Sequence, residues 1–100
     1  MKVLFVVTSN PFSKDFLTLK MLVRALSQKA EVSIFFSGNG AYYIQRPGIE
    51  FFKELGVRLL FCAHSAHQRG ILTYPEFCES SSTYNLSKLS TIFDKILVFN

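Results

Sequence analysis

Three short apolar runs, separated by residues with helical spacing, constrain the fold of this chain more than any other feature. The runs at residues 3–7, 32–36 and 57–61 are rich in β-branched and aromatic side chains, which is typical of strands covered on both faces. Between the first two, apolar residues recur at intervals of three and four from Phe12 to Leu26, as on one face of a helix. Strands that alternate with helices in this way predict a parallel sheet with helices on both of its faces.

Turn and capping residues divide the first two-thirds of the chain further. The dipeptide Asn-Pro at residues 10–11 supplies an N-cap and a first residue for the helix, which is expected to extend to about residue 29. The dipeptide Pro-Gly at residues 47–48 restarts the chain into a second helix, which ends before Gly56. A short helix is expected over residues 63–70.

The last third of the chain has weaker signals. Residues 73–76 have the spacing of a capping box, which predicts a helical turn through Cys78. A weak fourth strand is expected over residues 80–84, followed by a short helix over residues 86–93. Residues 95–99 are expected to form a final buried strand.

The expected fold class is α/β, a small Rossmann-like (flavodoxin-like) three-layer sandwich with a mainly parallel sheet of about five strands. Residues 1–100 are expected to form a single domain. A chain of this length buries only about two-thirds of the surface that it exposes when unfolded. Yet 49% of its residues are hydrophobic and 11 are phenylalanine. This surplus of apolar surface predicts a homo- or hetero-oligomer, or a patch that binds a partner.

The formal net charge of +4 comes from single Lys and Arg residues scattered along the chain. Nucleic-acid-binding proteins usually gather such residues on one face, so direct nucleic-acid binding is not expected. A mild positive charge also fits an anionic small ligand or an acidic protein partner. The run at residues 3–7 is shorter than the core of a signal peptide, and no segment is long enough to span a membrane. The chain is therefore expected to be soluble and cytoplasmic.

Cys62 directly follows the third apolar run and precedes the short helix. In doubly wound α/β proteins, ligand sites lie at the carboxyl ends of the strands. The partial positive charge at a helix amino terminus favours a thiolate over a thiol, and Arg69 or a protonated histidine would add to this effect. From its position alone, Cys62 is either a reactive thiol or a buried structural cysteine.

His64 and His67 lie three residues apart and share one face of the short helix. They are badly placed to act as a base for Cys62, because both turn away from the thiol. With Cys62 and Cys78 they match no standard zinc spacing, so no metal site is expected and they are interpreted as surface or interface histidines. Cys78 is either a candidate resolving thiol for Cys62 or a packed cysteine.

Small polar residues and glycines follow the first two apolar runs. Thr8 and Ser9 follow the first run, and Gly38, Asn39 and Gly40 follow the second. Both turns can present backbone N–H groups to an anion, and they are candidate anion-binding turns. The alternative is that the two glycines only form the turn. The glycines do not continue into a dinucleotide-binding fingerprint.

Several segments, taken in their order and spacing, resemble those of one known family. They are the polar dipeptide 8–9 after the first strand, the strand, glycine turn and tyrosine of residues 35–42, and the cysteine, small-residue helix and Arg-Gly of residues 62–70. A closing helix and strand follow at residues 85–90 and 94–99. With these features the chain resembles the DsrE/DsrF-like family of sulfur-relay proteins, and most closely its TusD/DsrE branch.

In that family, the cysteine at the position of Cys62 accepts a persulfide sulfur and passes it to the next carrier. The resemblance implies this sulfurtransferase role for Cys62 and for no other residue. Ala63, His64, Ser65 and Arg69 follow it along the chain and are expected to form its surroundings. The resemblance also implies a protein sulfur donor, a protein sulfur acceptor and an oligomer, and the chemistry requires neither a metal nor an organic cofactor.

Two alternative functions come from other classes. The first is a non-catalytic oligomeric module for binding or assembly, with the same fold and a buried Cys62. The second is a redox switch in which Cys62 and Cys78 form a disulfide. Accessibility of the Cys62 thiol separates the carrier from the module.

Overall fold

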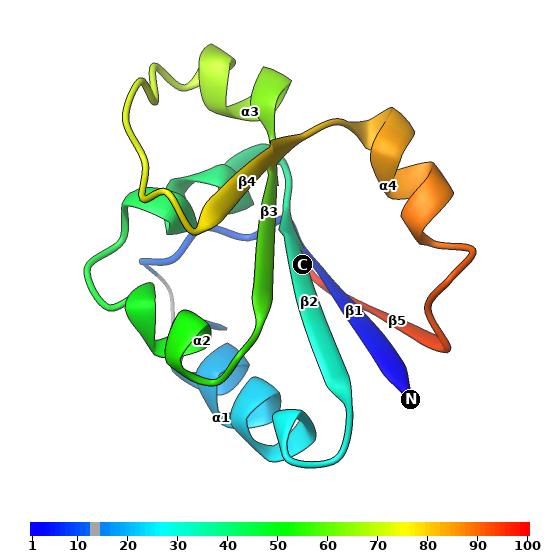
Figure 1. Ribbon diagram of the computed structural model, residues 1–100. Coiled ribbons are helices and arrows are strands. Elements are labelled where there is room, and N and C mark those ends of the chain that lie inside the picture. The colour runs from blue at the N-terminus through cyan, green and yellow to red at the C-terminus, as the bar shows by residue number, and fades with distance from the viewer. Residues whose placement is uncertain (13–14) are drawn as a thin grey trace.

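A computed structural model describes residues 1–12 and 15–100, and within them five parallel strands form one sheet (Figure 1). The strand order is β4-β3-β2-β1-β5. The strands are β1 Lys2–Val7, β2 Glu31–Phe36, β3 Arg58–Cys62, β4 Cys78–Ser81 and β5 Lys95–Phe99. The predicted α/β class, with a parallel sheet of about five strands, is confirmed.

Helices cover both faces of this sheet (Figure 1). In the described ranges they are α1 Asp15–Ser27, the 3-10 helix η1 Gly38–Gln45, α2 Glu50–Glu54, α3 Ala63–Gln68 and α4 Thr83–Leu89. From β1 to β4, each strand lies beside the previous one, always on the same side, and β5 then pairs with the free edge of β1. Because crossovers between parallel strands are right-handed, this reversal puts α4 on the face opposite to α1 and α2. The predicted three-layer sandwich is confirmed.

The larger of the two cores lies between the sheet and α1, η1 and α2. Its centre is aromatic, since the ring of Tyr43 stacks on Phe36 at 5.0 Å and meets Phe16 edge-on at 5.5 Å between ring centroids. All three side chains are buried. Rings packed in these two geometries stabilise the core beyond the burial of their area, and here they hold η1 against the end of β2.

The opposite face has a much smaller core. It consists of Leu4, Phe35, Leu60 and Cys62, covered in part by α4 side chains such as Leu86. No residue of α4 is buried. Cys62 therefore lies on the thinly covered face of the sheet.

None of the helices in the described ranges is long and apolar enough to cross a lipid bilayer.

Several predicted element boundaries are wrong. The first helix begins at Asp15 and not at Pro11, and the Asn10 side chain instead accepts the N–H of Phe12 at 2.9 Å in a local turn. Residues 13–14 of the predicted helix lie outside the described residues. The helical turn predicted from residues 73–76 is a single turn, in which the N–H of Cys78 donates to the carbonyl of Pro75 at 3.0 Å, and Cys78 then begins β4.

The predicted strand over residues 80–84 lies partly in β4 and partly in α4. The strand ends at Ser81, and Ser82 caps the following helix by accepting the N–H of Asn85 at 3.1 Å. A serine at this position favours a helix start over a continued strand. The predicted helix over residues 86–93 therefore begins and ends earlier, at Thr83 and Leu89.

β5 is at the predicted place but is not buried, so the prediction of burial is wrong. Its residues Ile96, Leu97 and Val98 are 43%, 42% and 68% exposed. The strand lies at the edge of the sheet and pairs only with β1. Its apolar composition is typical of an interior strand. The helices of this chain, however, cover the other strands and leave the side chains of β5 exposed.

Candidate functional site

Cys62 is both the last residue of β3 and the N-cap of α3. Its backbone is extended, and its Sγ accepts the backbone N–H of Ser65 at 3.5 Å. A side chain that accepts this bond satisfies one of the free N–H groups at the start of a helix, as serine or aspartate commonly does. The residue is 4% exposed. The thiol is therefore oriented by α3 and shielded from solvent.

The residues that flank Cys62 in the sheet lie at or just after the ends of the neighbouring strands. Cys62 is the register partner of Ser81, so both point to the α4 face of the sheet. On the other side of Cys62, the backbone hydrogen bonds of the sheet continue to the N–H groups of Ser37 and Thr8, which directly follow β2 and β1. The alternation along β1 and β2 puts these side chains on the same face, and the Thr8 hydroxyl donates to Asn100 Oδ1 at 2.7 Å.

Ser37 and Ser81 were not predicted as part of the site. The signal that could have found them is the register between parallel strands, which places small hydroxyl side chains on both sides of Cys62. That register depends on contacts between distant parts of the chain. It is not visible in the local sequence around the cysteine.

The glycine turn after β2 is tied to α3 and to its own strand. The N–H of Gly38 donates to Ser65 Oγ at 3.0 Å, and the N–H of Gly40 donates to the carbonyl of Ser37 at 2.9 Å. These two donors of the candidate anion-binding turn are therefore used inside the protein. Ser9, in the other candidate turn, has a buried hydroxyl without a hydrogen-bond partner in the part of the chain that is described.

Arg69 links α3 to the same turn. Its Nε and Nη2 donate to Asn39 Oδ1 at 3.1 and 3.0 Å, and its Nη1 donates to the carbonyl of Ser65 at 3.1 Å. These bonds direct the guanidinium to Asn39 and not to the Cys62 thiol. Arg69 therefore holds the cysteine-bearing helix in place, which differs from the expected role of a positive charge next to the sulfur.

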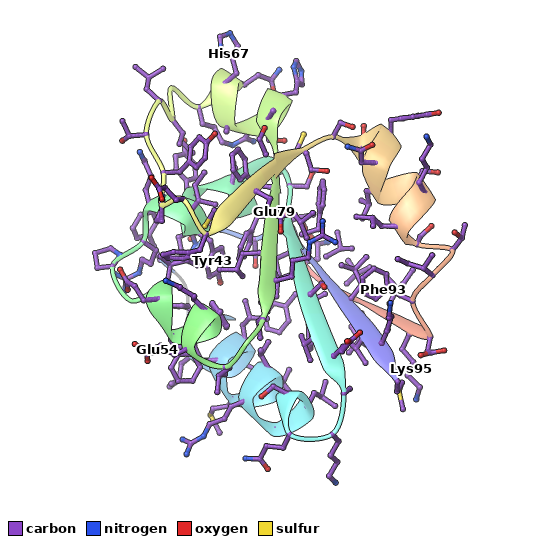
Figure 2. All side chains as sticks on the ribbon, viewed as in Figure 1. Tyr43, Glu54, His67, Glu79, Phe93 and Lys95 are labelled. Atoms are coloured by element: carbon purple, nitrogen blue, oxygen red, sulfur yellow. The ribbon has the colours of Figure 1, made fainter. Side chains whose placement is uncertain are left out.

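The two histidines lie on the exposed side of α3. Figure 2 shows His67 at the outer end of the helix, with its side chain directed away from the sheet. His64 is exposed as well, as is Ala63. Among residues 1–12 and 15–100, no three His, Cys, Asp or Glu side chains gather in a way that could hold a metal ion.

The structure does not bring Cys78 and Cys62 together. Cys78 pairs with Leu59, three residues before the Cys62–Ser81 pair, which corresponds to about 10 Å along the strands. It also packs in the larger core, on the face opposite to Cys62. A disulfide needs two Cα atoms within about 7 Å and converging side chains. The resolving role would require β4 to rearrange.

Burial raises the pKa of the Cys78 thiol to about 11, so the folded state is expected to lose stability at alkaline pH. Up to its ordinary pKa of 9.0 the thiol is protonated in both states, and its contribution is fully present. Between that value and about 11 only the unfolded chain releases the proton, which removes roughly 2 kcal/mol of stability.

Urea unfolding from pH 8 to 11 would measure this effect, with Cys78→Ala as the matched control. The alanine variant is expected to be less stable at neutral pH and to depend less steeply on alkaline pH. Parallel pH dependences of the two proteins would contradict the expectation.

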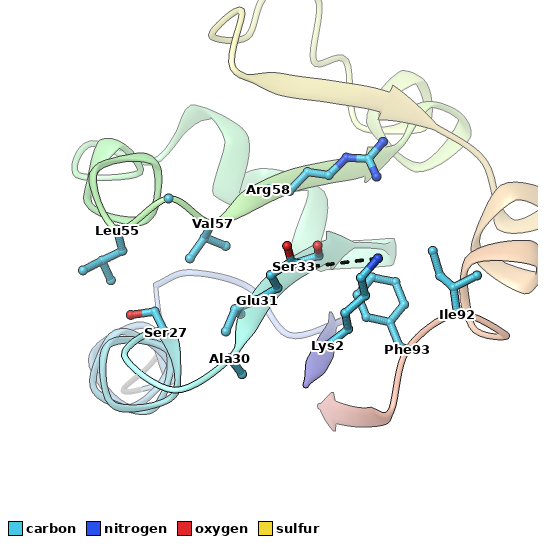
Figure 3. Close-up of a pocket in the computed structure, with 12 residues that line it drawn as sticks. Lys2, Ser27, Ala30, Glu31, Ser33, Leu55, Val57, Arg58, Ile92 and Phe93 are labelled. Carbon is cyan, nitrogen blue, oxygen red and sulfur yellow. Dashed lines mark ion pairs between the residues drawn. The ribbon is translucent and has the colours of Figure 1, made fainter.

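Two of the cavities adjoin at Arg58, which lines both. One of about 380 Å³ lies between Leu55 and Phe93 at the amino-terminal edge, where Lys2 and Glu31 form an ion pair at 3.8 Å (Figure 3). Cys62 ends its strand at the opposite edge, so this cavity is not part of the thiol site.

The second cavity, of about 350 Å³, lies between α4 and strands β3 and β4, and Ser81 is among its lining residues. Arg58 and Glu79 form a bidentate ion pair there at 2.8 and 3.0 Å. The guanidinium of Arg58 holds the pKa of the Glu79 carboxyl below its ordinary value. The cavity therefore extends from a neutralised ion pair to the hydroxyl next to Cys62.

Comparison with known proteins agrees with the fold. A model of the DsrE/DsrF-like family matches residues 1–99. The crystal structure of the ychN protein from E. coli superposes with a TM-score of 0.84, covering 99% of each chain at 20% sequence identity. At that identity the similarity demonstrates a shared fold. No curated protein matches this chain.

Proposed function

The chain belongs to the DsrE/DsrF-like family, and on this premise we propose that it carries a persulfide sulfur on Cys62 between a donor and an acceptor protein thiol. The observation that supports the proposal is the place of Cys62, at the carboxyl end of β3 and the N-cap of α3. Ligand sites of doubly wound sheets gather at this edge. The other cysteine lies inside the larger core.

The proposed transfer is an exchange between thiols. The Cys62 thiolate attacks the outer sulfur of a donor persulfide, a new S–S bond forms, and the old S–S bond breaks. The bonding pair leaves with the donor thiolate, which takes up a proton. An acceptor thiolate then attacks the outer sulfur on Cys62 in the same way. The atoms and electrons balance without a cofactor.

Burial of Cys62 requires that its cover opens for transfer. The smaller core contains only four buried residues, and α4, which covers it in part, contributes none of them. Moving α4 therefore exposes less apolar surface than moving α1 with its buried Phe16, Leu19 and Val23. We place the opening on the α4 side of the sheet.

The same burial favours a second candidate function, a binding or assembly module in which Cys62 only packs. A thiol that is 4% exposed is common in protein cores. A redox switch has less support, since the fold separates the two cysteines.

Alkylation of the native protein at neutral pH distinguishes the carrier from the module. The carrier is expected to react with iodoacetamide at Cys62 on a timescale of minutes and to leave Cys78 unmodified, because opening on the α4 side exposes only the first thiol. Peptide mapping identifies the modified residue. Protection of both cysteines until the protein unfolds would refute the carrier and favour the module.

We propose further that the protein is an oligomer and works with protein partners in the cytoplasm. The exposed side chains of β5, together with its free edge, support an interface. A second copy of this chain at that interface would form a homo-oligomer, and a related chain would form a hetero-oligomer. The cytoplasm fits the chemistry, because thiols stay reduced there.

Val98→Glu is expected to convert the oligomer to a single chain. The side chain is 68% exposed in one copy, so a carboxylate costs little there, whereas within an apolar interface it would be buried without a partner. Sedimentation equilibrium measures the mass, and Glu54→Gln on α2 is a control on the other side of the fold. An unchanged oligomer would place the interface away from β5.

A further inference from the structure

Ser81 is the residue of β4 that stands directly beside Cys62. The two are register partners in parallel strands, which lie about 4.8 Å apart, and both side chains point to the α4 face. Ser81 is 9% exposed, so it is nine-tenths buried. Its hydroxyl therefore lies on the same face of the sheet as the thiol, on the neighbouring strand.

The hydroxyl of Ser81 makes no hydrogen bond within residues 1–12 and 15–100, and its oxygen remains in contact with solvent. Its donor is therefore available to water or to a bound group. The sulfur of Cys62 is already oriented by the N–H of Ser65 on its other side. Ser81 thus retains a free donor on the face of the sheet that carries the thiol.

A cavity borders Ser81 on this face of the sheet, and Cys62 is not among its lining residues. Ser81 lines the cavity of about 350 Å³ between α4 and strands β3 and β4, so its side chain borders open space. Of the charged residues of that cavity, Arg58 and Glu79 neutralise each other, and Lys88 lies with its ammonium 4.6 Å from the centroid of the Tyr84 ring. The Ser81 hydroxyl is the polar group of this cavity nearest in register to the thiol.

We propose that Ser81 binds the outer sulfur of the persulfide on Cys62, with its hydroxyl donating a hydrogen bond to the terminal sulfur anion. This inference rests on the proposed function and adds a binding residue to it. The loading step is Cys62 thiolate plus a persulfide, giving the Cys62 persulfide and the donor thiol, in which one S–S bond forms and one breaks. A hydrogen bond to a charged acceptor is stronger than one between neutral groups, so Ser81 favours the loaded state.

The test is the loading equilibrium of Cys62 against glutathione persulfide and glutathione at fixed ratios. Intact mass gives the fraction of chains with one extra sulfur, and peptide mapping locates it. Ser81→Ala is expected to lower the equilibrium constant about tenfold. Ser81→Thr keeps the hydroxyl and is expected to restore loading to within twofold of the wild type.

Ser80→Ala is the matched control, because Ser80 is exposed and points to the other face of the same strand. The alkylation rate of unloaded Cys62 is measured in each variant, so that a change in access to the thiol is separated from a change in loading. If Ser81→Ala loads sulfur as well as the wild type, the role of Ser81 is wrong but the proposed function still stands. The same conclusion follows if Ser81→Thr fails to restore loading. A wild type that takes up no sulfur on Cys62 would overturn the proposed function as well.

Discussion

Cys62→Ser is expected to abolish sulfur transfer while the protein stays folded. The serine oxygen can accept the N–H of Ser65 in place of the sulfur, so the N-cap of α3 is kept. A hydroxyl, however, does not form a persulfide with a donor at neutral pH, since the nucleophile of this exchange is a thiolate. The change in the free energy of unfolding is expected to stay within about 2 kcal/mol.

The rate of sulfur movement from a persulfide donor to an acceptor thiol measures this effect, with the protein present in catalytic amount. Cys78→Ser is the matched control, because it removes the only other thiol of the sequence. That variant is expected to keep the activity, at some cost in stability from the larger core. Wild-type rates in folded Cys62→Ser would refute the role of the cysteine.

Gly40→Ala is expected to reduce the stability more than any other single substitution considered. A Cβ at this position would lie 2.1 Å from the carbonyl oxygen of Val7 and 2.8 Å from its carbonyl carbon. Both are backbone atoms of β1, which is paired on both sides in the sheet. Neither can move without shifting the strand, so we expect a loss of about 3 kcal/mol or more.

Urea unfolding of Gly40→Ala and Gly56→Ala measures two different effects. The first variant reports the close approach to β1, and the second reports the cost of placing alanine at a positive φ. Gly56 has a positive φ of 79°, but no atom beyond its two chain neighbours lies within 4 Å of a Cβ built on it. Its alanine variant is expected to lose only about 1 to 2 kcal/mol. Equal losses at the two positions would contradict the contact between the turn and β1.

Local patterns predicted most of the fold. The spacing of Phe16, Leu19 and Val23 identified α1, and these residues are the buried face of that helix. The apolar runs that became β1, β2 and β3 were also located to within about a residue. Each of these signals depends on which residues lie close in the chain, so a reading of the sequence can detect it.

The errors occurred where distant contacts decide the structure. The fourth strand starts at Cys78 and not at Ser80, because Cys78 pairs with Leu59. β5 has the composition of an interior strand, but its burial depends on the number of helices that cover it. The position of Cys62 at a strand end was predicted, whereas its neighbours Ser37 and Ser81 follow from register between strands.

The central claim is that Cys62 carries the sulfur, and peptide mass after incubation of the wild-type protein with a persulfide donor tests it most directly. The chain provides its own control, because Cys62 and Cys78 lie on opposite faces of the sheet and fall in different environments. We predict the gain of one sulfur atom on the peptide that contains Cys62, removed by an acceptor thiol, and none on the peptide that contains Cys78. No gain on Cys62, or an equal gain on both cysteines, would contradict the claim.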